Sequence, residues 1–198
     1  MQKTAHNDHA ILDQLRLRWS PRAFSSCPVP PESVRSLLEA ARWAPSAHNS
    51  QPWRFIIAVR EQDEAQFEIA LGCLSEWNRG WAAPAPVLLF AISETHFDNG
   101  SDNRHDFYDT GQAMAGLAVQ ATTLGLFVHQ MAGILADEIR QTYALPEGFE
   151  PVCAAAIGYL GEADSLADDL KEKELAVRVR RPLAETVFSG AWGKSAAL

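Results

Sequence analysis

The spacing of apolar residues along the chain separates candidate helices from candidate strands. Apolar residues that recur every three or four positions predict helices over residues 10–17, 31–44, 61–74, 106–124 and 137–143. Short runs of apolar and β-branched residues predict buried strands over residues 53–59, 85–92, 127–131 and 152–160. Because helices and strands alternate irregularly, the pattern predicts an α+β fold in which helices cover a sheet.

Prolines set the limits of the helix predicted over residues 31–44, and small residues are frequent in the helix predicted over residues 106–124. Pro30 and Pro31 favour a helix start, because proline suits the first helical turn, and Pro45 disfavours helical backbone in the residue before it. The helix predicted over residues 106–124 is rich in glycine and alanine. A glycine inside a helix costs about 1 kcal/mol relative to alanine, so we expect this helix to pack closely against another backbone.

Residues 161–198 lack the regular pattern of the preceding chain. They are first acidic and then basic, and a helix predicted over residues 166–177 has no clear apolar stripe. The apolar side chains of Val187, Phe188 and Trp192 stand near the end of this segment. They predict that the tail lies on a surface, either of its own subunit or of a partner.

Composition and charge narrow the class of protein. A chain of 198 residues suits one domain, and its formal net charge of −8 disfavours a nucleic acid partner. Three cysteines without a CxxC pair indicate neither a disulfide framework nor a zinc site. The start of the chain lacks the apolar stretch of a signal peptide, and no apolar run is long enough to cross a bilayer. We therefore expect a cytoplasmic protein with no membrane partner.

The common signatures of nucleotide and hydrolase sites do not occur. The sequence has no GxGxxG after a strand, no phosphate-binding P-loop and no GxSxG. Arginines cluster instead at residues 16–22 and 178–181. Each cluster alone is typical of a solvated segment, but together with Ser20 they could hold a phosphate. His48 and His129 lie near special loops, and the favoured interpretation is that they face solvent or support neighbouring residues.

Four segments together resemble the FMN-dependent nitroreductase family. They are RWSPRAF at 18–24, the polar loop APSAHNSQPWRF at 44–55, LGLFVHQMAG at 124–133 and RRPLAETVF at 180–188. The resemblance implies an α+β homodimer with a central, mainly antiparallel sheet flanked by helices. It also implies an FMN-binding core at residues 1–160 and a C-terminal extension at residues 161–198 that is exchanged over the partner subunit.

The resemblance assigns phosphate and flavin contacts to both ends of the chain. Arg22 would reach the N1/O2 side of the flavin ring, and Trp19 would contribute mainly its backbone. The residues assigned in this way are Arg18, Trp19, Ser20, Arg22, Arg178 and Arg180.

Loop residues are assigned to the ribityl chain and the flavin ring. The polar loop would reach the FMN of the other subunit, an asparagine would contact the pyrimidine edge, and the backbone after the third strand would face flavin N5. These residues are Pro45, Ser46, Ala47, Asn49 and Gln51, then Asn78, and then Met131, Ala132 and Gly133. The sequence departs from the common family pattern at Trp19, Ala47 and Ala132.

The implied activity is electron transfer from NADH or NADPH through FMN to a nitroaromatic, quinone or similar acceptor, in a ping-pong cycle. The cofactor carries the hydride chemistry at N5, which agrees with the lack of a nucleophile motif in the sequence. Two alternatives remain open on the same fold. One is a flavin-dependent dehalogenase or dehydrogenase of a specific metabolite, and the other is a flavin-binding dimer without turnover.

Overall fold

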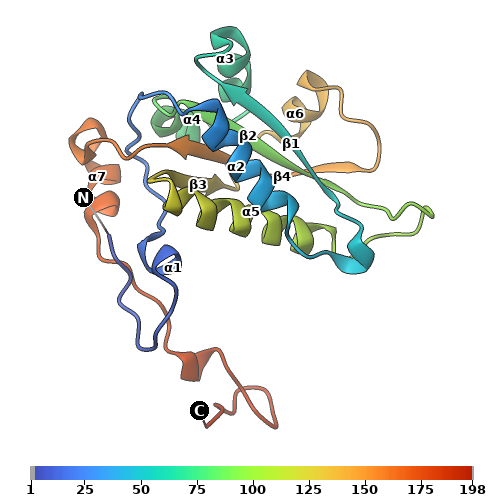
Figure 1. Ribbon diagram of the computed structural model, residues 1–198, viewed down its shortest axis with the longest axis vertical. Helices are drawn as coiled ribbons and strands as arrows, with labels where there is room; N and C mark the ends of the chain where they lie inside the picture. The colour runs from blue at the N-terminus through green and yellow to red at the C-terminus, as the bar shows by residue number, and fades with distance from the viewer. Residues whose placement is uncertain (1–2, 198) are drawn as a thin grey trace.

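A computed structural model describes residues 3–197, which form a four-stranded sheet with helices on both faces (Figure 1). The strands are β1 (Trp53–Val59), β2 (Val87–Glu94), β3 (Phe127–Met131) and β4 (Phe149–Gly158). They lie in the order β1-β2-β4-β3, and every neighbouring pair is antiparallel. The α+β class and the antiparallel sheet predicted from the sequence are confirmed.

Helices cover the two faces of the sheet unequally. On one face the long helices α2 (Pro31–Arg42) and α5 (Asp106–Thr123) run side by side (Figure 1). The other face carries the shorter helices α3 (Glu64–Gly72), α4 (Glu76–Ala82) and α6 (Ala136–Thr142). A separate cluster of buried apolar side chains fills each interface. Strand β2 is buried along nearly its whole length because it lies between the two clusters.

The close packing predicted for the glycine-rich helix occurs within the chain itself. A Cβ atom placed on Gly116 in α5 would lie 3.0 Å from the carbonyl oxygen of Ala40 in α2. The missing side chain therefore allows the two helices to approach each other over the sheet.

The first half of the chain holds one helix that the sequence pattern does not predict. The helix expected over residues 61–74 is shorter, as α3, and a separate helix α4 follows it. Ser75 caps the start of α4, since its hydroxyl accepts the backbone N–H of Asn78 at 3.5 Å. Because Trp81 and Ala82 in α4 lead directly into the apolar run of β2, the pattern does not reveal where this helix ends. Helix α1 (Asp13–Leu17) is also shorter than expected.

Residues 161–175, which the resemblance assigns to the C-terminal extension, pack against the sheet and its helices, which together form the body of the protein. The N–H of Gly161 donates to the carbonyl of Ala23 at 2.8 Å, and Leu170 of helix α7 (Asp168–Leu175) belongs to the core. Only beyond residue 176 does the chain leave the body and run beside the N-terminal segment (Figure 1). The short turns of 3-10 helix are η1 (Ala47–Asn49), η2 (Ala163–Ser165) and η3 (Leu183–Glu185). No helix within residues 3–197 is both long and apolar enough to cross a membrane.

Candidate functional site

Arginines from the two ends of the chain meet on one surface. Burial lowers the pKa of Arg18, and the charge of Arg180 lowers it further. Burial also lowers the pKa of Arg178, with further contributions from Arg18 and Arg180. Among the described residues, none of these three arginines forms an ion pair with a carboxylate. Three neighbouring cations without an acid repel one another, and a bound phosphate would relieve this repulsion.

Arg178 and Arg180 have different roles in this arginine cluster. Arg178 Nη1 donates to the backbone carbonyls of Lys3 at 2.8 Å and of Arg16 at 3.0 Å, and so joins the two ends of the chain. Arg180 donates at 2.8 Å to the carbonyl of its neighbour Val179. Its exposed guanidinium keeps most of its five donors available for an anion.

Arg22 is fixed at its backbone and keeps an unused side-chain donor. Its N–H lies 3.0 Å from each carboxylate oxygen of Glu174 in α7, and the N–H of Ala23 lies 3.2 Å from the same group. The guanidinium carbon lies 5.3 Å from the ring centroid of Trp77 and 5.9 Å from that of Trp81. Within the described residues, its buried Nε has no hydrogen-bond partner. A buried donor without a partner is rare in proteins and fits a bound acceptor such as the carbonyl edge of a flavin.

Trp19 and Ser20 precede Arg22 in the same segment and differ in burial. Trp19 is buried, meets Phe127 edge-on with the ring centroids 5.9 Å apart, and has Lys3 Nζ at 4.8 Å over its ring. Among residues 3–197 its buried indole N–H has no hydrogen-bond partner, and the predicted backbone contact of Trp19 with a flavin stays a prediction. Ser20 is half-buried between Trp19 and the segment that carries Arg22.

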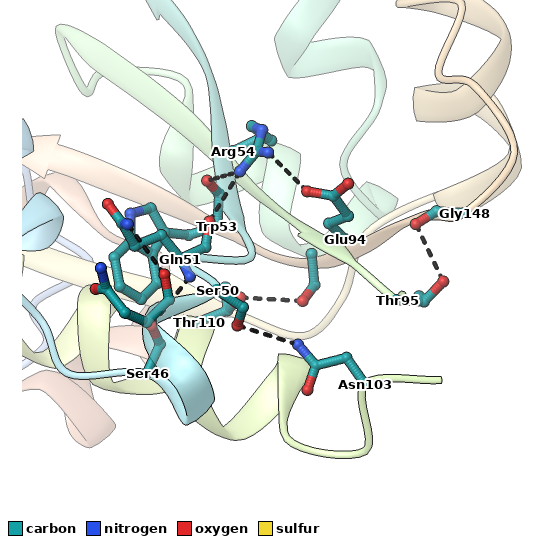
Figure 2. A network of polar contacts seen from close by, with 12 residues as sticks. Ser46, Ser50, Gln51, Trp53, Arg54, Glu94, Thr95, Asn103, Thr110 and Gly148 are labelled. Carbon is teal, nitrogen blue, oxygen red and sulfur yellow. Dashed lines mark hydrogen bonds and ion pairs between the residues drawn. The ribbon is translucent and has the colours of Figure 1, made fainter. Parts of the chain in front are cut away.

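The polar loop from Pro45 to Gln51 has a strained backbone. His48, Asn49 and Gln51 have φ angles of 53°, 56° and 49°, a region that costs a residue other than glycine about 1–3 kcal/mol. The Ser46 hydroxyl accepts the N–H of Gln51 at 3.0 Å (Figure 2), and the buried Asp109 of α5 accepts the N–H of Ala47 at 2.8 Å. Strain that surrounding contacts maintain in this way is typical of functional sites.

The loop and the arginine cluster lie on opposite sides of one protomer. In Figure 1 the loop, which immediately precedes β1, is far from the surface between α1 and α7. Pro45, Ser46 and Ala47 line a hollow with residues of α5, and Asn49 and Gln51 line one with Phe97 and Asp98. Arg178 and Arg180 lie instead beside Ala5 and His6, so one chain does not bring the loop to the arginine cluster. The predicted contact of this loop with the FMN of a second subunit is compatible with this separation and stays a prediction.

Asn78 joins α4 to the end of β3. Its side-chain amide donates to the carbonyl of Gly133 at 2.9 Å, and its oxygen accepts the indole N–H of Trp81 at 3.2 Å. Ser75 donates its N–H to the same Gly133 carbonyl at 3.0 Å. A primary amide has two N–H donors, so the predicted contact of Asn78 with a flavin would use the second one. Met131 is buried in this region and Ala132 is exposed.

Two buried carboxylates that the sequence pattern does not single out support the site. Glu174 accepts the backbone N–H of Arg22, and Asp109 accepts that of Ala47. Glu174 gives no sequence signal because it ends an acidic stretch in which every other acid faces solvent or is only partly covered. Asp109 looks like an ordinary acid in the first turn of a helix.

The two histidines noted in the sequence have different environments. His48 is exposed and meets Phe97 edge-on, with the ring centroids 5.7 Å apart. His129 in β3 is half-buried, and burial lowers its pKa from the ordinary 6.5 to about 4, although a hydrogen bond to Pro21 opposes this shift. At neutral pH the imidazole of His129 is therefore uncharged.

The lowered pKa of His129 should make stability depend on pH. Between pH 6.5 and about 4 the unfolded chain binds a proton at this position that the folded chain does not bind. The free energy of unfolding should therefore fall as the pH falls through this window, by at most about 3 kcal/mol from His129 alone. Urea unfolding at pH 7 and at pH 4.5 would measure this change. In a His129→Asn variant the difference between the two pH values should shrink by that amount; an unchanged difference would assign the effect to other groups.

The fold and the arginine-rich surface define an α+β protein with neighbouring cations on one side, and the family model identifies the class. The model described as the nitroreductase family matches residues 15–159. The chain therefore belongs to the nitroreductase family.

Individual relatives resemble the chain over most of its length. A crystal structure described as an oxidoreductase containing FMN is 38% identical, covers 96% of each chain and superposes with a TM-score of 0.89. A Stenotrophomonas maltophilia protein, provisionally described as an NADH dehydrogenase/NAD(P)H nitroreductase, is 26% identical and is aligned over 77% of this chain and 86% of its own. An iodotyrosine dehalogenase 1 homolog of Caenorhabditis elegans is 27% identical over 86% of this chain, which spans 60% of that protein.

Proposed function

We propose that this chain is an FMN-dependent oxidoreductase that takes electrons from NADH or NADPH and reduces a nitroaromatic, quinone or similar small acceptor. The observation that carries the proposal is the meeting of Arg18, Arg178 and Arg180 without an acid, next to an Arg22 whose buried Nε has no partner among the described residues. The likeness to an FMN-containing oxidoreductase over nearly the whole chain supports the same cofactor.

The residues of this surface divide the work of holding and tuning the cofactor. FMN, when bound, accepts a hydride from the nicotinamide and delivers electrons to the acceptor. The arginine cluster would hold its phosphate through charge-assisted hydrogen bonds. Arg22 would place a positive charge and the Nε donor at the pyrimidine side of the ring, which favours the negative charge that reduction adds there. The rings of Trp77 and Trp81 lie beside the guanidinium of Arg22 and would hold it in place through cation–π contacts.

We further propose that the functional unit is a homodimer. Beyond the body, Val177, Val179 and Trp192 are exposed in the single chain by 84%, 77% and 92%. Exposed apolar groups of this size on one segment favour burial against a second copy. The separation of the polar loop from the arginine cluster supports a site to which two subunits contribute. Analytical ultracentrifugation of the purified protein would determine the number of subunits, and a monomer that binds FMN and turns over would contradict this proposal.

The direct test of the function is spectroscopic. Purified protein should be yellow or become yellow with added FMN, and anaerobic NADH or NADPH should bleach its flavin absorption. Addition of a nitroaromatic or a quinone should then restore the oxidised spectrum. A protein that cannot take up FMN would refute the proposal, and bound FMN that no reduced nicotinamide bleaches would favour a binding protein without turnover.

A second candidate function is reductive dehalogenation, which the likeness to the dehalogenase homolog favours. The same reduced protein would then be reoxidised faster by an iodinated or brominated phenol than by a nitroaromatic or quinone of equal concentration. Stopped-flow measurement of the reoxidation rates, with release of halide as a second readout, would separate the two activities.

Arg180→Ala should weaken the binding of FMN. The change removes a charge-assisted phosphate contact worth about 1.5–3 kcal/mol, so the dissociation constant should rise roughly 10- to 100-fold. Titration of the apoprotein with FMN, followed by flavin fluorescence, would measure it. Arg181→Ala is the matched control, because Arg181 is an adjacent exposed arginine that does not contribute to the lowered pKa of Arg18 or Arg178. Equal effects of the two changes would remove Arg180 from the phosphate site.

A further inference from the structure

The peptide unit between Pro21 and Arg22 is held from both sides by side chains from distant parts of the fold. His129 Nδ1, in β3, lies 2.8 Å from the carbonyl oxygen of Pro21. The N–H of Arg22, at the other end of the same peptide plane, donates to both oxygens of Glu174 in α7 at 3.0 Å. A peptide unit that is bonded at both its carbonyl and its N–H cannot rotate without losing one of these bonds, so the direction in which Arg22 leaves the backbone is fixed.

The carbonyl oxygen of Pro21 determines which tautomer of His129 is present. A carbonyl oxygen only accepts hydrogen bonds, so Nδ1 of His129 must carry the proton and donate it to Pro21. The lowered pKa of His129 means that Nε2 is unprotonated at neutral pH. The histidine is therefore a neutral donor with one defined tautomer rather than a cation beside Arg22.

The ring of His129 also contacts a side chain whose hydrogen bonds lead to the end of β3. It packs at a tilt against Trp81, with the ring centroids 4.4 Å apart. Trp81 donates its indole N–H to Asn78, and Asn78 donates to the carbonyl of Gly133. The same Trp81 ring lies 5.9 Å from the guanidinium carbon of Arg22. One continuous set of contacts thus joins Arg22, which the resemblance assigns to the N1/O2 side of the flavin ring, to Gly133, which it assigns to flavin N5.

We propose that His129 is a positioning residue that sets Arg22 relative to the Gly133 backbone through the Pro21 carbonyl and the Trp81 ring. This inference rests on the proposed function, since it concerns the same FMN site. His129 does not touch the cofactor or exchange a proton with it. Its effect on FMN passes through Arg22, and this distinguishes it from a histidine that only fills the core.

Two substitutions separate the effect of the Nδ1–H donor of His129 from the effect of its ring. His129→Phe keeps a ring against Trp81 but removes the donor to Pro21, and it should weaken FMN binding roughly tenfold and lower the reduction potential of the bound flavin. His129→Asn keeps an N–H donor at the δ position and should bind FMN within about threefold of the wild type. Wild-type affinity and potential in His129→Phe would overturn the proposal.

A double-mutant cycle with Arg22 tests whether His129 acts through that residue. In an Arg22→Met background, His129→Phe should change the FMN dissociation constant by less than about twofold, because the guanidinium that His129 positions is then gone. An undiminished tenfold effect in that background would show that His129 has only a general structural role, and would overturn the proposal.

Nitrogen NMR of the wild-type protein provides a test that needs no variant to fold. The imidazole of His129 should show a protonated Nδ1 and an unprotonated Nε2 at pH 7, and the opposite tautomer would overturn the proposal. A wild-type protein that fails to bind FMN would refute the proposed function together with this inference. Normal FMN binding that does not respond to His129→Phe would refute this inference alone.

Discussion

A chain that ends at residue 176 is expected to lose FMN and to be colourless after purification. The truncation removes Arg178 and Arg180, two of the three cations that meet at the proposed phosphate site. It keeps Leu170 and the buried Glu174, so the body should still fold. The loss of two charge-assisted contacts of about 1.5–3 kcal/mol each would weaken FMN binding by roughly 100-fold or more. FMN titration and circular dichroism of the purified chain would measure binding and folding separately.

A second truncation separates phosphate binding from subunit contact. A chain that ends at residue 189 lacks the exposed Trp192 but keeps both arginines. Since both arginines remain, the fraction of this chain that is still dimeric should retain FMN, while sedimentation experiments should show a weaker dimer. A chain ending at residue 176 that remained yellow would refute the assignment of Arg178 and Arg180.

Gly133→Ala is expected to disrupt the hydrogen-bonded contact between α4 and the end of β3. The added Cβ would lie 2.5 Å from Asn78 Nδ2 and 2.8 Å from Ser75 Oγ. Asn78 is buried and already hydrogen-bonded to Gly133, so it cannot move without losing that bond. Overpacking of this kind costs about 1–3 kcal/mol of stability, and the backbone predicted to face flavin N5 would shift. Urea unfolding and FMN titration would measure the two effects.

Gly80→Ala in α4 is the matched control for this substitution. A Cβ on Gly80 would meet no atom within 4 Å, and alanine favours a helix by up to about 1 kcal/mol over glycine. This variant should therefore be as stable as the wild type or more stable, with unchanged FMN affinity. If Gly133→Ala bound FMN as tightly as Gly80→Ala, the Asn78–Gly133 contact would have no part in cofactor binding.

The sequence pattern predicts elements that depend on local spacing and misses contacts that depend on distant residues. The strand predicted at 127–131 is found at its predicted limits, and α5 ends within one residue of its predicted limit. Helix α4 is not predicted because it is short and runs into the apolar residues of β2. The closeness of the arginines at residues 16–22 to those at residues 178–181 could be inferred from their charge and from the family resemblance. The burial of Glu174 could not, because its partners are the backbone N–H groups of Arg22 and Ala23, which leave no mark in the sequence.

The contacts that join the two ends of the chain also set an order for biosynthesis. The bond between Arg22 and Glu174 spans 152 residues, and that between Arg178 and Lys3 spans 175. A growing polypeptide emerges from the ribosome N-terminus first, so all four strands are available to fold before Glu174, Arg178 and Arg180 appear. Formation of such long-range contacts is slow, because a large loop must close first. In a nascent chain the four strands are therefore synthesised before Arg178 and Arg180, the residues proposed to hold the phosphate of FMN.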